Sequence, residues 1–206
     1  MTSPTTSPVS SPMSSPVSSP MSSPMSSPMS SDALGFRPAT ADDAAELTSF
    51  GERIFRRTFG PDNTAEDMDL YCREAFTVER QRRELVDPDR HTLLAVIGGE
   101  LAGYAQLVAG PPPELVTGPD AIELLRFYVD VSWHGRGLAQ ALMARTVAAA
   151  AERRALTLYL GVWDRNHRAI AFYLRQGFAR VGSRPFVLGH DRQIDELMAR
   201  PVRAPR

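Results

Sequence analysis

The stretch Tyr128–Ala150 reads YVDVSWHGRGLAQALMARTVAAA and places a glycine-rich turn, Gly135-Arg136-Gly137, between two patterns. An apolar extended run precedes the turn, and a run with helical spacing follows it. Backbone N–H groups at the start of a helix lack partners within the helix and lie at its positive end, so such a turn suits a phosphate. The same pattern also fits a strand-to-helix turn in which glycine serves backbone geometry alone.

Two common phosphate motifs do not fit this turn. A dinucleotide-binding fingerprint requires a third glycine where Gln140 stands, and it belongs to the first strand–helix unit of a domain. The phosphate loop of nucleotide hydrolases requires a lysine, but all 23 basic residues of this chain are arginine. A different phosphate-bearing ligand has to be considered.

Composition divides the chain into two parts. Residues 1–33 form a Ser/Pro/Met-rich low-complexity tail, which we expect to be disordered because it has too little apolar surface to offset the entropy of ordering. Residues 34–206 have the composition of one globular domain. With Asp32 set aside in the tail, the domain has 23 basic and 23 acidic residues. This balance argues against nucleic acid or an anionic membrane as a partner.

Cysteine and histidine usage narrows the chemistry further. Cys72 is the single cysteine, which excludes a disulfide framework and favours a cytoplasmic location. The four histidines have no ligand spacing, so we expect no metal.

Periodicity and turn signals predict an α/β fold with the element order β-α-α-α-β-β-β-α-β-α-β-β. Strands are expected near 36–39, on both sides of Gly98-Gly99 within 91–110, and at 121–131, 155–162, 178–188 and 192–198. Helices are expected at 41–58, from Thr64 to about residue 76, and at 78–86, 137–154 and 166–176.

The glycine turn resembles motif A of the GNAT superfamily of N-acetyltransferases, whose pattern is Gln/Arg-x-x-Gly-x-Gly/Ala. Gly137 and Ala139 match the glycine and small-residue positions. His134 stands at the first position in place of Gln or Arg, which weakens one diphosphate contact but none of those made by the backbone.

A second block, GVWDRNHRAIAFYLRQGFARVG, resembles the part of the family that follows motif A. It holds Asn166 and a helix that ends Tyr-x-x-x-Gly-Phe, with the tyrosine at Tyr173. Several stretches, among them TFGPDN and GHDRQIDELM, are also similar to the bacterial PaiA-type polyamine acetyltransferases.

The resemblance implies a GNAT fold, in which helices flank a mixed, mostly antiparallel sheet that is splayed at its middle strands. It implies acetyl-CoA as co-substrate, with the pantetheine arm between the splayed strands. Backbone groups of Val129 and Val131 would pair with that arm. The residues implied in cofactor binding are Val129, Val131, His134, Gly135, Arg136, Gly137, Leu138, Ala139 and Asn166, and Asn166 could instead cap its own helix.

By the same resemblance, acetyl passes directly from the thioester to an amine. An alkylammonium has a pKa of about 10.4, so a base must remove a proton at neutral pH. Glu123 is the candidate base, and strict alternation would put Glu123, Leu125, Phe127 and Val129 on one strand face. Tyr173 is the candidate acid for the departing thiolate. The alternative for Glu123 is a solvated carboxylate without a catalytic role, and the alternative for Tyr173 is an ordinary aromatic residue of the core.

The acceptor is expected to be a small primary amine. Asp62, Glu66, Asp67 and Asp69 would suit a polyamine, although acidic residues also favour a helix N-terminus through its dipole. An alternative acceptor is the amine of a peptide or protein. An alternative function is that of a non-catalytic acyl-CoA-binding module. A homodimer is expected from the resemblance alone.

Overall fold

The computed structural model describes residues 34–202, so the predicted low-complexity tail lies outside the described part of the chain. Its seven strands form one sheet in the order β1-β2-β3-β4-β5-β7-β6, and every neighbouring pair except β4–β5 is antiparallel. The strands are β1 (Leu34–Pro38), β2 (Arg90–Ile97), β3 (Glu100–Ala109), β4 (Ala121–Val129), β5 (Thr157–Trp163), β6 (Ala179–Leu188) and β7 (Asp191–Pro201). The predicted mixed α/β class and the predicted order of helices and strands along the chain are confirmed.

In the described part of the chain, five α-helices flank this sheet, and their predicted positions are also confirmed. They are α1 (Ala44–Phe59), α2 (Ala65–Ala75), α3 (Val78–Val86), α4 (Leu138–Glu152) and α5 (His167–Arg175). The first helix begins slightly later than predicted, because Ala41–Asp43 form a 3-10 turn, η1, before α1. Thr64 caps α2 by accepting a hydrogen bond from the Asp67 N–H.

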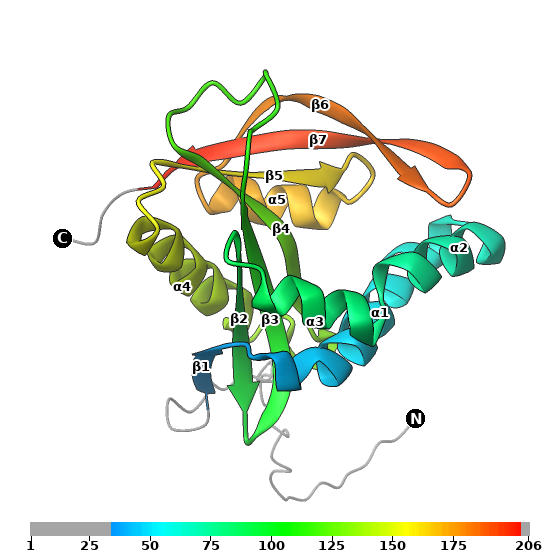
Figure 1. Ribbon diagram of the computed structural model, residues 1–206. Coiled ribbons are helices and arrows are strands. Elements are labelled where there is room, and N and C mark those ends of the chain that lie inside the picture. The colour runs from blue at the N-terminus through cyan, green and yellow to red at the C-terminus, as the bar shows by residue number, and fades with distance from the viewer. Residues whose placement is uncertain (1–33, 203–206) are drawn as a thin grey trace, which may run out of the picture.

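Helices cover both faces of the sheet. The largest core cluster joins α4 and α5 to the middle strands through Leu142, Leu158 and Ile170. A separate cluster packs α1 against β2 and β3, and a third packs α1 against α2. Figure 1 shows α3 crossing over β2 and β3, and the β6–β7 hairpin reaching toward α2. There the His190 N–H donates to Asp67, with 2.7 Å between nitrogen and oxygen.

β4 carries a bulge that reverses the direction of its side chains. Leu124 and Arg126 pair with consecutive residues of β3, so Leu125 is an extra residue on β4. The prediction that Glu123, Leu125, Phe127 and Val129 share one face is therefore wrong. Leu124 joins the same core cluster as Phe127 and Val129, which leaves Glu123 on the opposite face of the sheet.

β4 and β5 separate soon after they begin. These parallel strands pair at three positions only, the last of which joins Glu123 to Tyr159. Beyond that point the edge of β4 that faces β5 is open, as expected for a sheet splayed at its middle strands.

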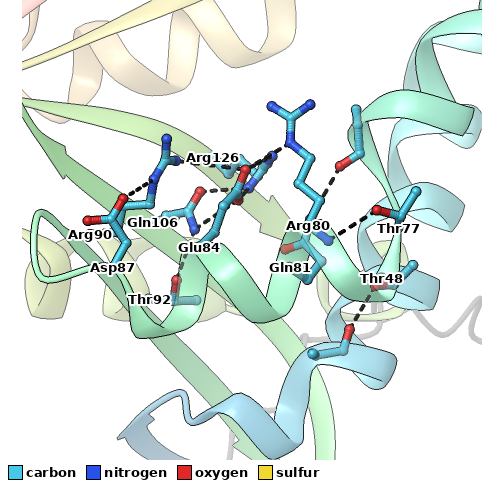
Figure 2. A network of polar contacts seen from close by, with 12 residues as sticks. Thr48, Thr77, Arg80, Gln81, Glu84, Asp87, Arg90, Thr92, Gln106 and Arg126 are labelled. Carbon is cyan, nitrogen blue, oxygen red and sulfur yellow. Dashed lines mark hydrogen bonds and ion pairs between the residues drawn. The ribbon is translucent and has the colours of Figure 1, made fainter.

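A buried polar network fixes α3 to the middle of the sheet (Figure 2). Glu84 of α3 forms an ion pair with Arg126 of β4, and it also accepts a hydrogen bond from Arg80 at 3.0 Å. Arg126 donates to Gln106 Oε1 at 2.6 Å, and Gln106 in turn donates to Thr92 Oγ1 at 3.2 Å. Burial opposes the charge of Glu84, but its contacts with the two arginines outweigh burial and lower its pKa to about 2.

We expect Glu84→Gln to lower the free energy of unfolding by about 3–5 kcal/mol at pH 7, because the Arg126 charge is left buried with too few partners. Urea denaturation measures this loss. Glu79→Gln is the matched control, since Glu79 forms an exposed ion pair with Arg83 on the same helix, and it should cost less than about 1 kcal/mol.

The difference between wild type and Glu84→Gln should depend on pH in one direction. The folded pKa of Glu84 lies below its ordinary value of 4.5. Its stabilising effect is therefore present above pH 4.5 and is lost as the pH falls toward 2. Equal losses in the two variants, or a difference that persists at pH 2, would contradict this account.

Candidate active site

A cleft of about 740 Å³ lies where β4 and β5 diverge. Its walls come from β4 and β5, from the β6–β7 hairpin, from α1, α2, α3 and α5, and from the glycine turn before α4. Every residue that the sequence singled out for the cofactor lines this cleft except Arg136 and Leu138; the lining set is Val129, Val131, His134, Gly135, Gly137, Ala139 and Asn166.

The glycine turn has a backbone that only glycine adopts easily. Gly135 and Gly137 have φ angles of 77° and 87°, and Gly137 is the N-cap of α4. A Cβ added at either glycine would meet nothing within 4 Å. The N–H groups of the first helical turn, from Leu138 onward, have no partner within the helix. The turn therefore presents free donors beside open space.

Arg136 and Leu138 of the turn do not line the cleft. The Arg136 N–H donates to the Trp133 carbonyl at 3.3 Å, so it is not among the free donors. The Arg136 guanidinium lies over the Trp133 ring, 5.3 Å from its centre. Leu138 is fully buried, so it contributes backbone alone to the turn.

The end of β4 presents one backbone N–H to the cleft. The Asp130 N–H donates to Ala102 of β3 at 2.9 Å. Neighbouring N–H groups of a strand point to opposite edges, so the Val129 N–H points toward the open edge facing β5. The Val129 carbonyl lies 3.1 Å from His134 Nε2. His134 therefore donates a hydrogen bond from Nε2–H to the carbonyl at the end of β4. Burial lowers the pKa of His134.

Val131 does not extend the strand. β4 ends at Val129, and Val131–Trp133 form a 3-10 turn, η3, in which the Val131 carbonyl accepts from the His134 N–H at 3.0 Å. Val131 lies in a turn because Asp130 ends the strand by accepting from the Ser132 N–H, and its pairing with the pantetheine arm stays a prediction.

Asn166 caps α5, one of the two roles left open by the sequence. Its Oδ1 accepts from the Ala169 N–H at 3.1 Å. Since Asn166 also lines the cleft, its amide nitrogen can still contact a ligand.

Tyr173 of α5 stands on the cleft wall with its ring packed among aromatic residues. The ring centre lies 5.6 Å from that of Phe178 and 6.3 Å from that of Phe127. Burial raises the pKa of Tyr173, so the phenol keeps its proton at neutral pH.

The predicted base, Glu123, lies on the face of the sheet that α1 and α2 cover, and it does not line the cleft. Glu123 Oε1 forms an ion pair with Arg184 Nη2 of β6 at 2.8 Å. Arg184 Nε lies 3.8 Å from Asp195 Oδ2 of β7. Asp195 does line the cleft and is 8% exposed. Burial raises the pKa of Asp195 to about 6.

Sequence reasoning missed two cleft residues. Asp195 shares a strand face with Leu197, so a carboxylate on the apolar face of a strand was the available signal. Arg168 lines the cleft close to His134, whose pKa its charge helps to lower. Arg168 follows the cap Asn166 by two positions, and a cation there suits a nearby phosphate.

Residues 34–202 contain neither a candidate metal cluster nor a candidate membrane span. No group of three or more His, Cys, Asp or Glu side chains there could hold a metal ion. None of the helices described has the length and apolar character needed to span a membrane.

Comparisons with known proteins agree with this geometry. A model of the acetyltransferase (GNAT) family matches residues 52–178, which include the glycine turn, Asn166 and Tyr173. The chain belongs to the GNAT family of acetyltransferases. An uncharacterized N-acetyltransferase of Lactobacillus delbrueckii subsp. lactis is 31% identical over 160 residues, which cover 78% of this GNAT chain and 92% of that protein.

A second relative has a named activity. The N-alpha-acetyltransferase RimI of Mycobacterium tuberculosis is 36% identical over 105 residues, which cover 50% of this chain and 60% of RimI.

Solved structures show the same fold. The PaiA N-acetyltransferase of Thermoplasma acidophilum, in complex with coenzyme A, superposes with a TM-score of 0.68 at 18% identity, covering 82% of this chain and 99% of that one. The ribosomal-protein-alanine N-acetyltransferase of Brucella melitensis gives 0.63 at 23% identity, covering 81% and 98%.

Family membership makes this GNAT protein an N-acetyltransferase, an enzyme of the acyltransferase class that uses acetyl-CoA. The residues present fit that co-substrate. The free N–H groups from Leu138 onward suit its diphosphate, and the open edge of β4 suits a polar chain with amide groups. When bound, acetyl-CoA supplies the acetyl group as a thioester.

Proposed function

We propose that this GNAT enzyme transfers acetyl from acetyl-CoA to the primary amine of a small molecule by direct attack on the thioester. The observation that supports this is a cleft at the splayed strands with a phenol on the α5 side and a carboxylate, Asp195 of β7, on the opposite side. A base and an acid on opposite faces suit an amine and a thioester that meet between them.

The residues take separate roles in this proposal. The turn from Gly135 to Ala139 binds the diphosphate, and Asn166 contacts the pantetheine arm. The Val129 N–H points to the open edge, where it can stabilise the negative charge that develops on the thioester oxygen. Tyr173 protonates the sulfur as the C–S bond breaks. A carboxylate on the acceptor face takes the proton from the ammonium, and Glu123 is the residue that the sequence offers.

Aromatic side chains favour an acceptor with one ammonium and an apolar body. Tyr71 of α2 stacks on Phe55 of α1 with 4.6 Å between ring centres, and Phe59 lies 5.7 Å from Trp163 of β5. All four line the cleft. Aromatic faces attract a cation and leave room for an apolar group.

The acidic stretch that suggested a polyamine lies elsewhere. Asp69 forms an ion pair with Arg56 at 2.7 Å, and Asp67 accepts from the His190 N–H. Neither lines the cleft, whose lining includes six arginines and one carboxylate, Asp195. A long polycation would meet more repulsion there than a monoamine. A peptide N-terminus is the second candidate, favoured by the similarity to RimI.

Thiol release from acetyl-CoA across a panel of amines tests the proposal. The panel should contain phenethylamine, spermidine and a short peptide with a free N-terminus. We expect the monoamine to be acetylated with at least a tenfold higher kcat/KM than spermidine. No turnover of any small amine, with turnover of the peptide, would move the function to peptide N-acetylation. Faster turnover of spermidine would restore the polyamine interpretation.

A further inference from the structure

We infer that Asp195, and not Glu123, is the base that takes the proton from the acceptor ammonium, and that Glu123 is a positioning residue that acts through Arg184. This inference rests on the proposed function and specifies its acceptor side.

Asp195 is the carboxylate that reaches the cleft. It lies opposite Trp163 of β5 and opposite Arg184 of β6 in the register of the two strand pairs. Trp163 in turn contacts Phe59 of α1, which places Asp195 beside the aromatic end of the cleft. An ammonium held by those rings would lie next to the Asp195 carboxylate.

Glu123 forms an ion pair with Arg184 and does not reach the cleft. Its side chain is 15% exposed and forms the ion pair with Arg184 at the last paired position of β4 and β5. Arg184 reaches it by crossing β5 at Gly161, where an added Cβ would lie 2.6 Å from Arg184 Nη2. The absence of a side chain at Gly161 therefore makes room for the guanidinium. Arg184 joins β6 to β4 across the apex of the splay.

The two carboxylates share this guanidinium unequally. Glu123 Oε1 lies 2.8 Å from Arg184 Nη2 without a well-aligned hydrogen bond, and Asp195 Oδ2 lies 3.8 Å from Arg184 Nε, so the guanidinium is closer to Glu123 than to Asp195. Glu123 therefore holds the cation, and Asp195 is left nearly buried with a weak partner. Such a carboxylate binds a proton more tightly than an exposed one, which is what a base working near neutral pH requires.

Some charged neighbours of Asp195 raise its pKa and one lowers it. Burial comes first among the causes that raise its pKa to about 6, and the nearby charges of Asp164 and Glu123 add to it. Arg184 acts in the opposite direction. Tyr71 also lies close enough for the Asp195 charge to help raise its pKa.

Protons and electron pairs balance in the transfer. The ammonium gives one proton to the Asp195 carboxylate, which later passes it to solvent. The nitrogen lone pair forms the C–N bond at the thioester carbon, and the C–S bond breaks with its electron pair on sulfur. Tyr173 gives its proton to the sulfur, and the second proton lost by the nitrogen restores the phenol.

The test compares kcat/KM for the best amine of the panel between pH 5 and 9 in wild type, Asp195→Asn and Glu123→Gln. Calorimetry of acetyl-CoA binding accompanies each variant. For wild type we expect activity to rise with pH through about 6, as Asp195 loses its proton. Asp195→Asn should lower kcat/KM by about 100-fold or more and abolish that rise, with acetyl-CoA affinity within about twofold of wild type. Asp195→Glu should restore part of the activity.

Glu123→Gln separates the two assignments. Loss of its negative charge removes one cause of the raised Asp195 pKa and frees Arg184 for Asp195. The rise in activity should therefore move to lower pH and remain visible. The assignment to Asp195 is overturned if Glu123→Gln abolishes the rise with pH. It is also overturned if Asp195→Asn has a kcat/KM within threefold of the wild-type value. A wild type that binds acetyl-CoA and acetylates no amine would overturn the proposed function itself, and the assignment with it.

Discussion

Gly137→Val is expected to weaken acetyl-CoA binding by at least about 100-fold. Gly137 has a φ of 87°, which a β-branched residue adopts only with strain. Its side chain would also project into the open space beside the free N–H groups of α4. Loss of two hydrogen bonds to a charged diphosphate, at roughly 1.5–3 kcal/mol each, corresponds to about 100-fold or more in affinity. Isothermal titration of acetyl-CoA measures the change.

Gly99→Val is the matched control for this variant. Gly99 has the same φ of 87° and the same open space around an added Cβ, but it lies in the β2–β3 hairpin and does not line the cleft. Both variants should lose stability by similar amounts, and only Gly137→Val should lose affinity. Equal affinities in the two variants would show that the turn before α4 has no part in holding the diphosphate.

Tyr173→Phe is expected to lower kcat by about 100-fold, because the sulfur loses its proton donor while the ring remains in place. The substituted ring would keep the packing against Phe178 and Phe127, so the melting temperature and the acetyl-CoA affinity should change little. Steady-state thiol release measures kcat. In wild type the raised pKa of Tyr173 keeps the phenol protonated, so Tyr173 should cause no fall in activity up to pH 9.

Tyr104→Phe provides the comparison. Tyr104 is also a buried tyrosine, 1% exposed, but it packs against Phe50 and Tyr128 and does not line the cleft. Its kcat should stay within about twofold of wild type. A kcat for Tyr173→Phe that matched this control would leave protonation of the sulfur to water or to another group.

The local features of the chain were predictable from its sequence. The order of helices and strands, the glycine turn before α4 and the cap at Asn166 all agree with the structure. Each depends on interactions within a few residues: the φ that glycine allows, a side chain that accepts from an N–H three positions on, and the spacing of apolar residues.

The acceptor side of the site was decided by tertiary structure. The extra residue Leu125 places Glu123 on the opposite face of the sheet. The alternation of side chains in the sequence does not show this bulge, because the bulge depends on how β4 pairs with β3. The contacts of Arg184 with Glu123 and Asp195 join β4 to the β6–β7 hairpin, which lies far from β4 in the chain. Asp195 lines the cleft and Glu123 pairs with Arg184 because of the strand register and the space over Gly161. Both exist only once the sheet has assembled.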